Sequence, residues 1–140
     1  MVIGIAEILN KISKMKKTEE KIEALKKNDC LALRVMLQAA YDPNVVFALP
    51  PGTPPYKPND LVDQEHIFRR EADFVRYFVE GFHPNLKQTK RELMFIEFLE
   101  RIAPEDAEML CKAKDKEKIP GIMMKHINAA MPDLIPNVED

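Results

Sequence analysis

CLALRVMLQAAY, residues 30–41, is almost wholly apolar, with Arg34 and Gln38 as its only strongly polar residues. These two residues lie four positions apart and therefore share one face of an α-helix, which leaves the other faces apolar. Asp42-Pro43 ends the helix, because the residue before a proline is pushed out of helical geometry. A helix that is apolar on nearly all sides must be buried, so we expect this one at the centre of the fold.

Apolar residues recur at helical spacing on both sides of this central helix, and no stretch has the pattern of a β-strand. We therefore expect an all-α fold, a compact bundle of about six helices. The capping-box sequence Thr89-Lys90-Arg91-Glu92 predicts a helix start at Thr89. The expected helices flanking 30–41 begin near residues 5, 18, 60, 89, 104 and 120 and end near residues 15, 27, 81, 102, 114 and 131, in that order.

The N-terminal helical region leaves two arrangements open. Thr18-Glu19-Glu20 has the sequence of a fresh helix start, a capping hydroxyl followed by acidic residues in the first turn. Alternatively, residues 5–27 form one amphipathic helix with a heptad pattern, which would pair with a second copy and give a homo-oligomer. Glu19 at a core position of that heptad weighs against the second arrangement.

Residues 43–59 contain six prolines, at positions that no regular helix or central strand tolerates. The segment also carries large apolar side chains, which a flexible linker would lack, so we expect an ordered extended arm between the third and fourth helices. Two PxxP patterns, Pro51–Pro54 and Pro55–Pro58, have a spacing that can dock on aromatic grooves of partner domains. The candidate partner-binding residues are Phe47, Leu49, Pro50, Pro51, Pro54, Pro55 and Tyr56.

Length and composition indicate one soluble domain over residues 1–140. Within it we distinguish N-terminal helices (1–42), the proline-rich arm (43–59), C-terminal helices (60–132) and an acidic tail (133–140). The formal net charge of −2 gives no long-range attraction to nucleic acid or an anionic membrane. No apolar run approaches the roughly 20 residues that span a bilayer, so we expect a cytoplasmic protein without membrane contact.

Residues suited to catalysis or metal binding are few and scattered. Cys30 and Cys111 lie in apolar helical patterns, which predicts reduced core thiols. The histidines, His66, His83 and His126, form no recognised ligand spacing, and Ser13 has no neighbouring base. Four glycines in total provide no phosphate-binding loop. We therefore expect no enzymatic activity, no metal and no cofactor.

Nucleic-acid binding is the alternative hypothesis. A helical hairpin around the turn at 81–90 would place several basic side chains on one surface, although acidic residues are interleaved among them. Such a surface would bind nucleic acid through phosphate contacts. The candidate residues are Arg69, Arg70, Lys87, Lys90 and Arg91.

Several long stretches resemble one known family: KIEALKKNDCLALRVMLQAAYDPNVVFALPPGTPPYKP (21–58), YFVEGFHPNLKQTKRELMFIEFLE (77–100), PEDAEMLCKAKDK (104–116), PGI (120–122) and MPDLIP (131–136). The chain is similar over residues 18–136 to a family of small proteins of unknown function from contractile-tailed bacteriophages, notably those of cyanobacteria. The resemblance implies a phage origin and a place in the host cytoplasm during infection. It implies no catalytic or binding residues.

Together these observations predict a non-enzymatic bacteriophage accessory protein that acts through protein–protein interaction in the infected cell. Its partner would be a phage or host protein that contacts the proline-rich arm. A nucleic-acid-binding protein of phage DNA metabolism or transcription, using the basic turn, is the alternative.

Overall fold

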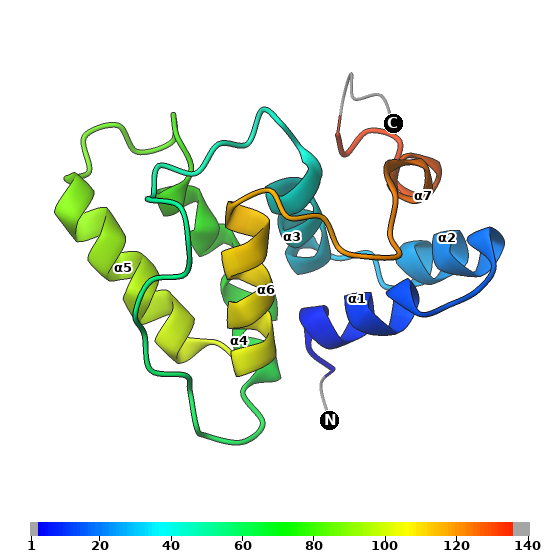
Figure 1. The fold of residues 1–140 in the computed structure, drawn as a ribbon, viewed down its shortest axis with the longest axis horizontal. Coiled ribbons are helices and arrows are strands. Elements are labelled where there is room, and N and C mark those ends of the chain that lie inside the picture. Colours follow the sequence, from blue (N-terminus) through cyan, green and yellow to red (C-terminus); the bar gives the residue numbers. More distant parts are fainter. Residues whose placement is uncertain (1–2, 136–140) are drawn as a thin grey trace.

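The computed structural model describes residues 3–135, and its regular elements are helices, which confirms the all-α prediction (Figure 1). Within these residues there are seven α-helices, one 3-10 helix (η1) and a single isolated β-bridge, between Phe47 and Val79. The elements are α1 (Ile5–Ser13), α2 (Thr18–Lys27), α3 (Leu31–Tyr41), α4 (Glu65–Glu71), η1 (Ala72–Phe78), α5 (Gln88–Arg101), α6 (Pro104–Lys114) and α7 (Met124–Ala130).

Helix α3 lies at the centre of the molecule, as its sequence predicts. It packs against α6, η1, α4 and α1, and most of its residues are buried. In Figure 1 it lies between two groups of helices: α4, α5 and α6 on one side, and α1, α2 and α7 on the other. Because α3 buries side chains toward both groups, it joins them into one hydrophobic core.

The N-terminal region forms two helices rather than one, because the chain turns at residues 14–17. The apolar side of α1 is buried inside the domain, with Ile5, Leu9 and Ile12 at most 1% exposed. That side packs against α6, α3 and α4. The apolar side of α1 is therefore occupied within the chain itself, and a contact between copies through α1 would have to use its polar side.

The prediction of a single helix from residue 60 to residue 81 is wrong. Residues 60–64 are irregular, α4 ends at Glu71, and η1 continues to Phe78. Ala72, Val75 and Phe78 are all buried and lie three residues apart. That spacing matches the three residues per turn of a 3-10 helix, whereas an α-helix would rotate Phe78 away from Ala72. Phe82, expected on the buried face, is 56% exposed.

Two helix starts also differ from expectation. Helix α5 begins at Gln88 after an extended Lys87, with no side-chain cap, so the capping box at Thr89 does not form. Residues 119–123, expected as the start of the last helix, form a turn held by the buried Tyr41 hydroxyl. That hydroxyl accepts a hydrogen bond from the Ile119 amide (2.9 Å) and donates one to the Ile122 carbonyl (2.7 Å).

Two predictions remain, on membrane contact and on the acidic tail. Among residues 3–135, every helix is too short or too polar to cross a bilayer. Most of the expected acidic tail, residues 136–140, lies outside the described residues.

Candidate functional site

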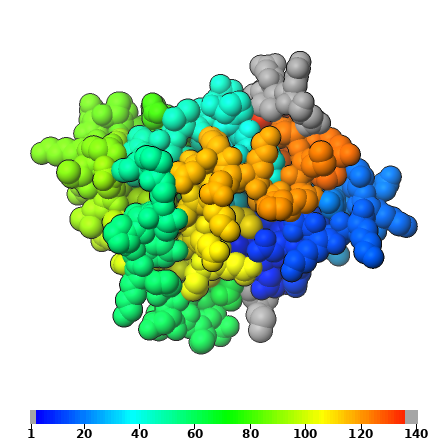
Figure 2. All heavy atoms as spheres, in the orientation of Figure 1, coloured from blue at the N-terminus to red at the C-terminus, as the bar shows by residue number. Residues whose placement is uncertain are grey.

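The most unusual feature of the surface is the proline segment, which we define as residues 43–59. It contains no helix and crosses the molecule between α5 and α6, seen as the teal band in Figure 2. At its start, the Ala48 amide donates to the Phe78 carbonyl and the Glu80 amide donates to the Val46 carbonyl, each at 2.8 Å. These two bonds form the Phe47–Val79 bridge and attach the segment to the end of η1.

A lysine and an aspartate at the end of α6 hold the centre of the segment. Lys114 Nζ donates to the Pro50 carbonyl (2.8 Å), and Asp115 Oδ2 accepts a hydrogen bond from the Gly52 amide (2.9 Å). Lys114 Nζ also lies 2.7 Å from Asp115 Oδ1, and the Lys114 side chain is 2% exposed. We call this pair the Lys114–Asp115 clamp. Because each member fixes one backbone group, the clamp sets the conformation between Pro50 and Gly52.

Helix α5 holds the segment on both sides of the clamp. Gln88 Nε2 donates to the Ala48 carbonyl (2.8 Å) at the start of the helix. At the other end of α5, Glu100 Oε2 accepts from the Lys57 amide (2.8 Å). Asn59 Nδ2 donates to the carbonyl of Arg101, also at 2.8 Å. The proline segment is therefore bonded along its length to two helices that lie far from it in sequence.

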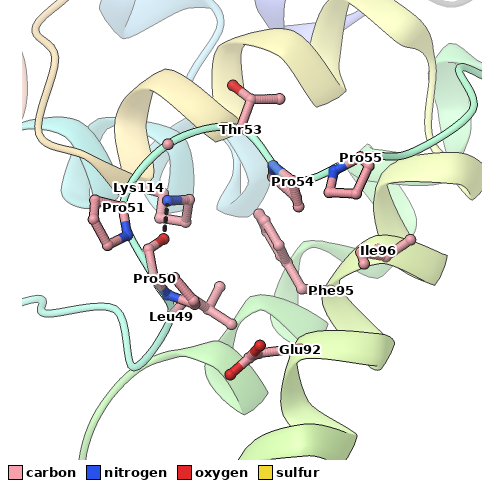
Figure 3. A pocket seen from close by; sticks show the side chains of 11 residues that line it. Leu49, Pro50, Pro51, Thr53, Pro54, Pro55, Glu92, Phe95, Ile96 and Lys114 are labelled. Carbon is pink, nitrogen blue, oxygen red and sulfur yellow. Dashed lines mark hydrogen bonds between the residues drawn. The ribbon is translucent and has the colours of Figure 1, made fainter.

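Between the segment and α5 lies a pocket of about 240 Å³ (Figure 3). One wall is the segment from Leu49 to Pro55, and the other is formed by Phe95 and Ile96 of α5. Figure 3 shows the Lys114 bond to Pro50 at one side of this pocket and Glu92 at another. The lining is mainly apolar, which is typical of a site that takes an apolar group.

Beneath the segment, Cys111 of α6 is buried and not disulfide-bonded. Burial raises the pKa of its thiol to about 11, although the Lys114 ammonium and the Thr53 hydroxyl act in the opposite direction. Burial also raises the pKa of Tyr56, which lies close to Cys111. A thiol of this kind stays protonated at neutral pH and is a weak nucleophile. Cys30 is also free, but it is only half-buried.

The structure places the predicted partner-binding residues along this one segment, but they do not all face solvent. Pro50, Pro51 and Pro55 are exposed. Phe47 is 8% exposed and part of the core, and the others are half-buried, with Leu49 and Tyr56 packed against the core. Phe47 and Tyr56 therefore hold the segment in place, and the prolines form its outer surface.

The predicted basic residues do not form one surface. Arg69 and Arg70 belong to α4, where Arg69 Nε donates to the Ile3 carbonyl (2.9 Å) and Arg70 pairs with Glu71. Lys87 and Lys90 are exposed at the start of α5, next to Arg91. The structure thus divides the predicted set between two places.

Arg91 itself is 7% exposed. Its guanidinium donates to the Tyr77 carbonyl (3.0 Å), the His83 carbonyl (2.8 Å) and Gln88 Oε1 (2.7 Å). These bonds tie the turn at 79–87 to α5. Arg91 therefore supports the fold and is not a free surface charge.

The predicted histidines lie in three separate elements. His66 is in α4, His83 is in the turn after η1, where its ring stacks on Tyr77, and His126 is in α7. In the part of the chain that the structure describes, no cluster of three or more His, Cys, Asp or Glu side chains is placed to hold a metal ion.

The residues that sequence reasoning missed are those that face the segment: Glu92, Phe95, Ile96, Lys114 and Asp115. Each is ordinary in its own helix or turn. Lys114 and Asp115 are more than 60 positions from their backbone partners. No local signal in the sequence marks them.

The fold and the site define a class of protein: a small all-α domain with a proline-rich segment fixed across two of its helices. The chain belongs to a family of unknown function, DUF6433, whose family model matches residues 8–119. The matched range includes the proline segment, the pocket and both residues of the Lys114–Asp115 clamp. No curated protein sequence matches the chain.

Proposed function

We propose that this protein is a non-enzymatic accessory protein that binds a protein partner through the outer surface of the proline segment. One observation carries the proposal. A proline-rich surface is held rigid by side chains from α5 and α6, and a largely apolar pocket opens beside it. A surface ordered before binding loses less conformational entropy on association, which favours recognition.

The resemblance to a bacteriophage family supports a setting for this function. We propose that the protein acts in the cytoplasm of an infected host cell and that its partner is a phage or host protein.

The exposed prolines supply the contact surface in this proposal. Pro50, Pro51 and Pro55 are exposed and follow each other along the segment. Proline has no backbone N–H and little conformational freedom, so such a surface is rigid and rich in hydrogen-bond acceptors. A partner surface with aromatic rings and hydrogen-bond donors complements it.

Affinity capture from infected host cells, with and without nuclease, tests the proposal. The tagged protein is expected to retain one protein at near-equal amounts after nuclease treatment. Pro51→Glu should abolish this retention, because it places a charge on the contact surface. Val62→Glu is the matched control, since Val62 is 80% exposed but lies outside the segment.

Three outcomes would contradict the proposal: no stoichiometric partner, a partner retained equally by both variants, or retention of nuclease-sensitive proteins only. The last outcome would support the nucleic-acid alternative. In that case Lys87→Met and Lys90→Met should weaken binding and reduce its dependence on salt.

A further inference from the structure

The pocket beside the proline segment has hydrogen-bonding properties that restrict what it can bind. Between Pro50 and Pro55, only Gly52 and Thr53 carry backbone N–H groups, and the Gly52 amide is already bonded to Asp115. Within residues 3–135, the carbonyls of Pro51, Thr53 and Pro54 accept no hydrogen bond. Among the described residues, the backbone of this wall therefore has three unpaired carbonyls and one unpaired amide, that of Thr53, and the Lys114 ammonium beside it is already bonded to Pro50 and Asp115.

The opposite wall adds apolar area and one further acceptor. Phe95 and Ile96 of α5 face the segment across the pocket (Figure 3). Glu92 lies at its edge, with Oε2 accepting a hydrogen bond from Gln88 Nε2 (3.0 Å). A carboxylate at this position disfavours an anionic ligand and favours a group that donates a hydrogen bond.

The size of the pocket fits a bicyclic aromatic ring. An apolar cavity of about 150 Å³ accommodates benzene, a ring of six atoms. By proportion, the nine-atom ring system of indole needs about 225 Å³. The pocket measures about 240 Å³. The proline rings provide flat apolar surfaces against which an aromatic ring packs well, the half-buried Ile96 adds apolar area, and the buried Phe95 closes the floor.

We infer that this pocket binds an aromatic side chain that carries a hydrogen-bond donor, and specifically the indole of a tryptophan in the partner. The indole ring supplies apolar area, and its N–H is a donor without an acceptor, which complements the unpaired carbonyls of the segment and the Glu92 carboxylate. The inference deepens the proposed function and rests on it, since the tryptophan belongs to the partner that the proline segment recognises.

The Lys114–Asp115 clamp prepares the site before the ligand arrives. It fixes Pro50 and Gly52, which form part of the pocket wall, through bonds of 2.8 and 2.9 Å. The wall need not reorganise on binding, so a small aromatic probe should bind without the rest of the partner.

The chain itself has no tryptophan, so binding of indole can be observed without background. The probe is N-acetyltryptophanamide, titrated with the whole protein while indole fluorescence is followed. We expect a saturable blue shift with a dissociation constant on the order of 1 mM. N-acetyl-leucinamide should not displace the probe. The 1-methylindole analogue, which lacks the N–H donor, should bind several-fold more weakly.

Two variants on α5 locate the site. Ile96→Phe should fill the pocket and weaken probe binding at least about tenfold. Leu93→Phe makes a similar change at a residue that is 58% exposed and does not line the pocket, and it should leave binding within about twofold. Thermal unfolding of both variants confirms that each is folded.

The inference would be overturned by any one of four results. These are no saturable signal, displacement of the probe by N-acetyl-leucinamide, equal binding of the 1-methylindole analogue, and equal effects of Ile96→Phe and Leu93→Phe. Partner capture separates this failure from that of the proposed function. If a partner is captured and lost in Pro51→Glu but the pocket does not bind indole, the proposed function stands and the tryptophan inference is rejected. If the pocket binds indole but no partner is captured, the pocket assignment stands and the proposed function is rejected.

Discussion

Asp106, in the first turn of α6, is a buried carboxylate with an incomplete set of partners. It is 1% exposed. Its Oδ1 accepts a hydrogen bond from the Ala6 amide of α1 (2.9 Å), but its Oδ2 has no hydrogen-bond partner among residues 3–135. Burial raises the pKa of Asp106 from 3.8 to about 6. The carboxylates of Glu105 and Glu65 add to the increase, and the Ala6 amide and the Arg69 guanidinium oppose it.

The raised pKa predicts that the protein loses stability as the pH rises. A carboxyl group with a higher pKa in the folded state binds its proton more tightly there than in the unfolded chain. Below pH 3.8 both states are protonated, and above about pH 6 both are ionised. At about 1.4 kcal/mol per pH unit, the full loss between these limits is about 3 kcal/mol. Between about pH 4.5 and about pH 7.5 it is about 2 kcal/mol.

Urea unfolding of the native protein and of Asp106→Asn, followed by circular dichroism across that pH range, measures this loss. The asparagine keeps an acceptor for the Ala6 amide and cannot ionise. Its stability relative to the native protein should increase by about 2 kcal/mol from the acidic to the neutral end. Asp60→Asn, at an exposed carboxylate, controls for the loss of one charge. A difference between native protein and Asp106→Asn that does not change with pH would refute the reasoning.

Gly121→Ala should cost about 3 kcal/mol or more in urea unfolding, because the added Cβ would clash with the Ser13 carbonyl oxygen at a φ of +91°. Arg91→Met should cost about 3 kcal/mol in the same assay, because it removes the hydrogen bonds that tie the turn at 79–87 to α5. Lys114→Met should release the Pro50 carbonyl and make local opening over Cys111 more frequent. The variant also loses the ammonium that lowers the Cys111 pKa, so we expect opening to outweigh this loss and speed alkylation only several-fold, measured with iodoacetamide and mass spectrometry.

Each of these three has a matched control. Gly81→Ala has a φ of +96° but nothing within 4 Å of the added Cβ, so it should cost only about 1 kcal/mol of backbone strain. Lys87→Met removes an exposed charge at the start of α5 and should be nearly neutral. Lys114→Met is compared with native Lys114, both in a Cys30→Ala background that leaves Cys111 as the only thiol to label. If a test variant behaved like its control, the corresponding contact would not have the role assigned here.

The helices whose boundaries the sequence predicted well are those with strong local signals at both ends. Helix α3 follows an apolar run that Asp42-Pro43 terminates, and α6 begins at Pro104, a favoured first-turn residue. In both, periodicity and end signals agree, so the tertiary context only reinforces the local preference.

The errors occur where tertiary contacts decide the local conformation. The turn at 119–123 replaces a helix start because the Tyr41 hydroxyl, about 80 positions away, bonds its backbone. Residues 72–78 form a 3-10 helix that packs Phe78 on Phe95, with ring centroids 5.1 Å apart. Neither contact could be predicted from local sequence, because both depend on how distant elements pack.

The candidate site was predictable only in part, for the same reason. The prolines of segment 43–59 are visible as a pattern, but the pocket requires α5, and the rigidity requires the Lys114–Asp115 clamp. Arg91 shows the converse problem: its charge suggested a surface role, and its bonds to backbone carbonyls place it in the interior. Residue type predicts chemistry, whereas burial and partners decide its use.

The bonds that hold the proline segment also indicate how it can take part in recognition. A PxxP ligand docks by inserting its ring faces into an aromatic groove of the partner. Here one side of the segment is bonded to Lys114, Asp115 and Glu100 and packs on α5 and α6. Docking as a free peptide would break these bonds, at about 1 kcal/mol each, and would expose Phe47 and Tyr56. A loss of several kcal/mol weakens binding by a factor of a hundred or more, on the order of tenfold for each 1.4 kcal/mol. The segment therefore suits the part of a receptor surface, which accepts a side chain from the partner, better than that of a peptide ligand.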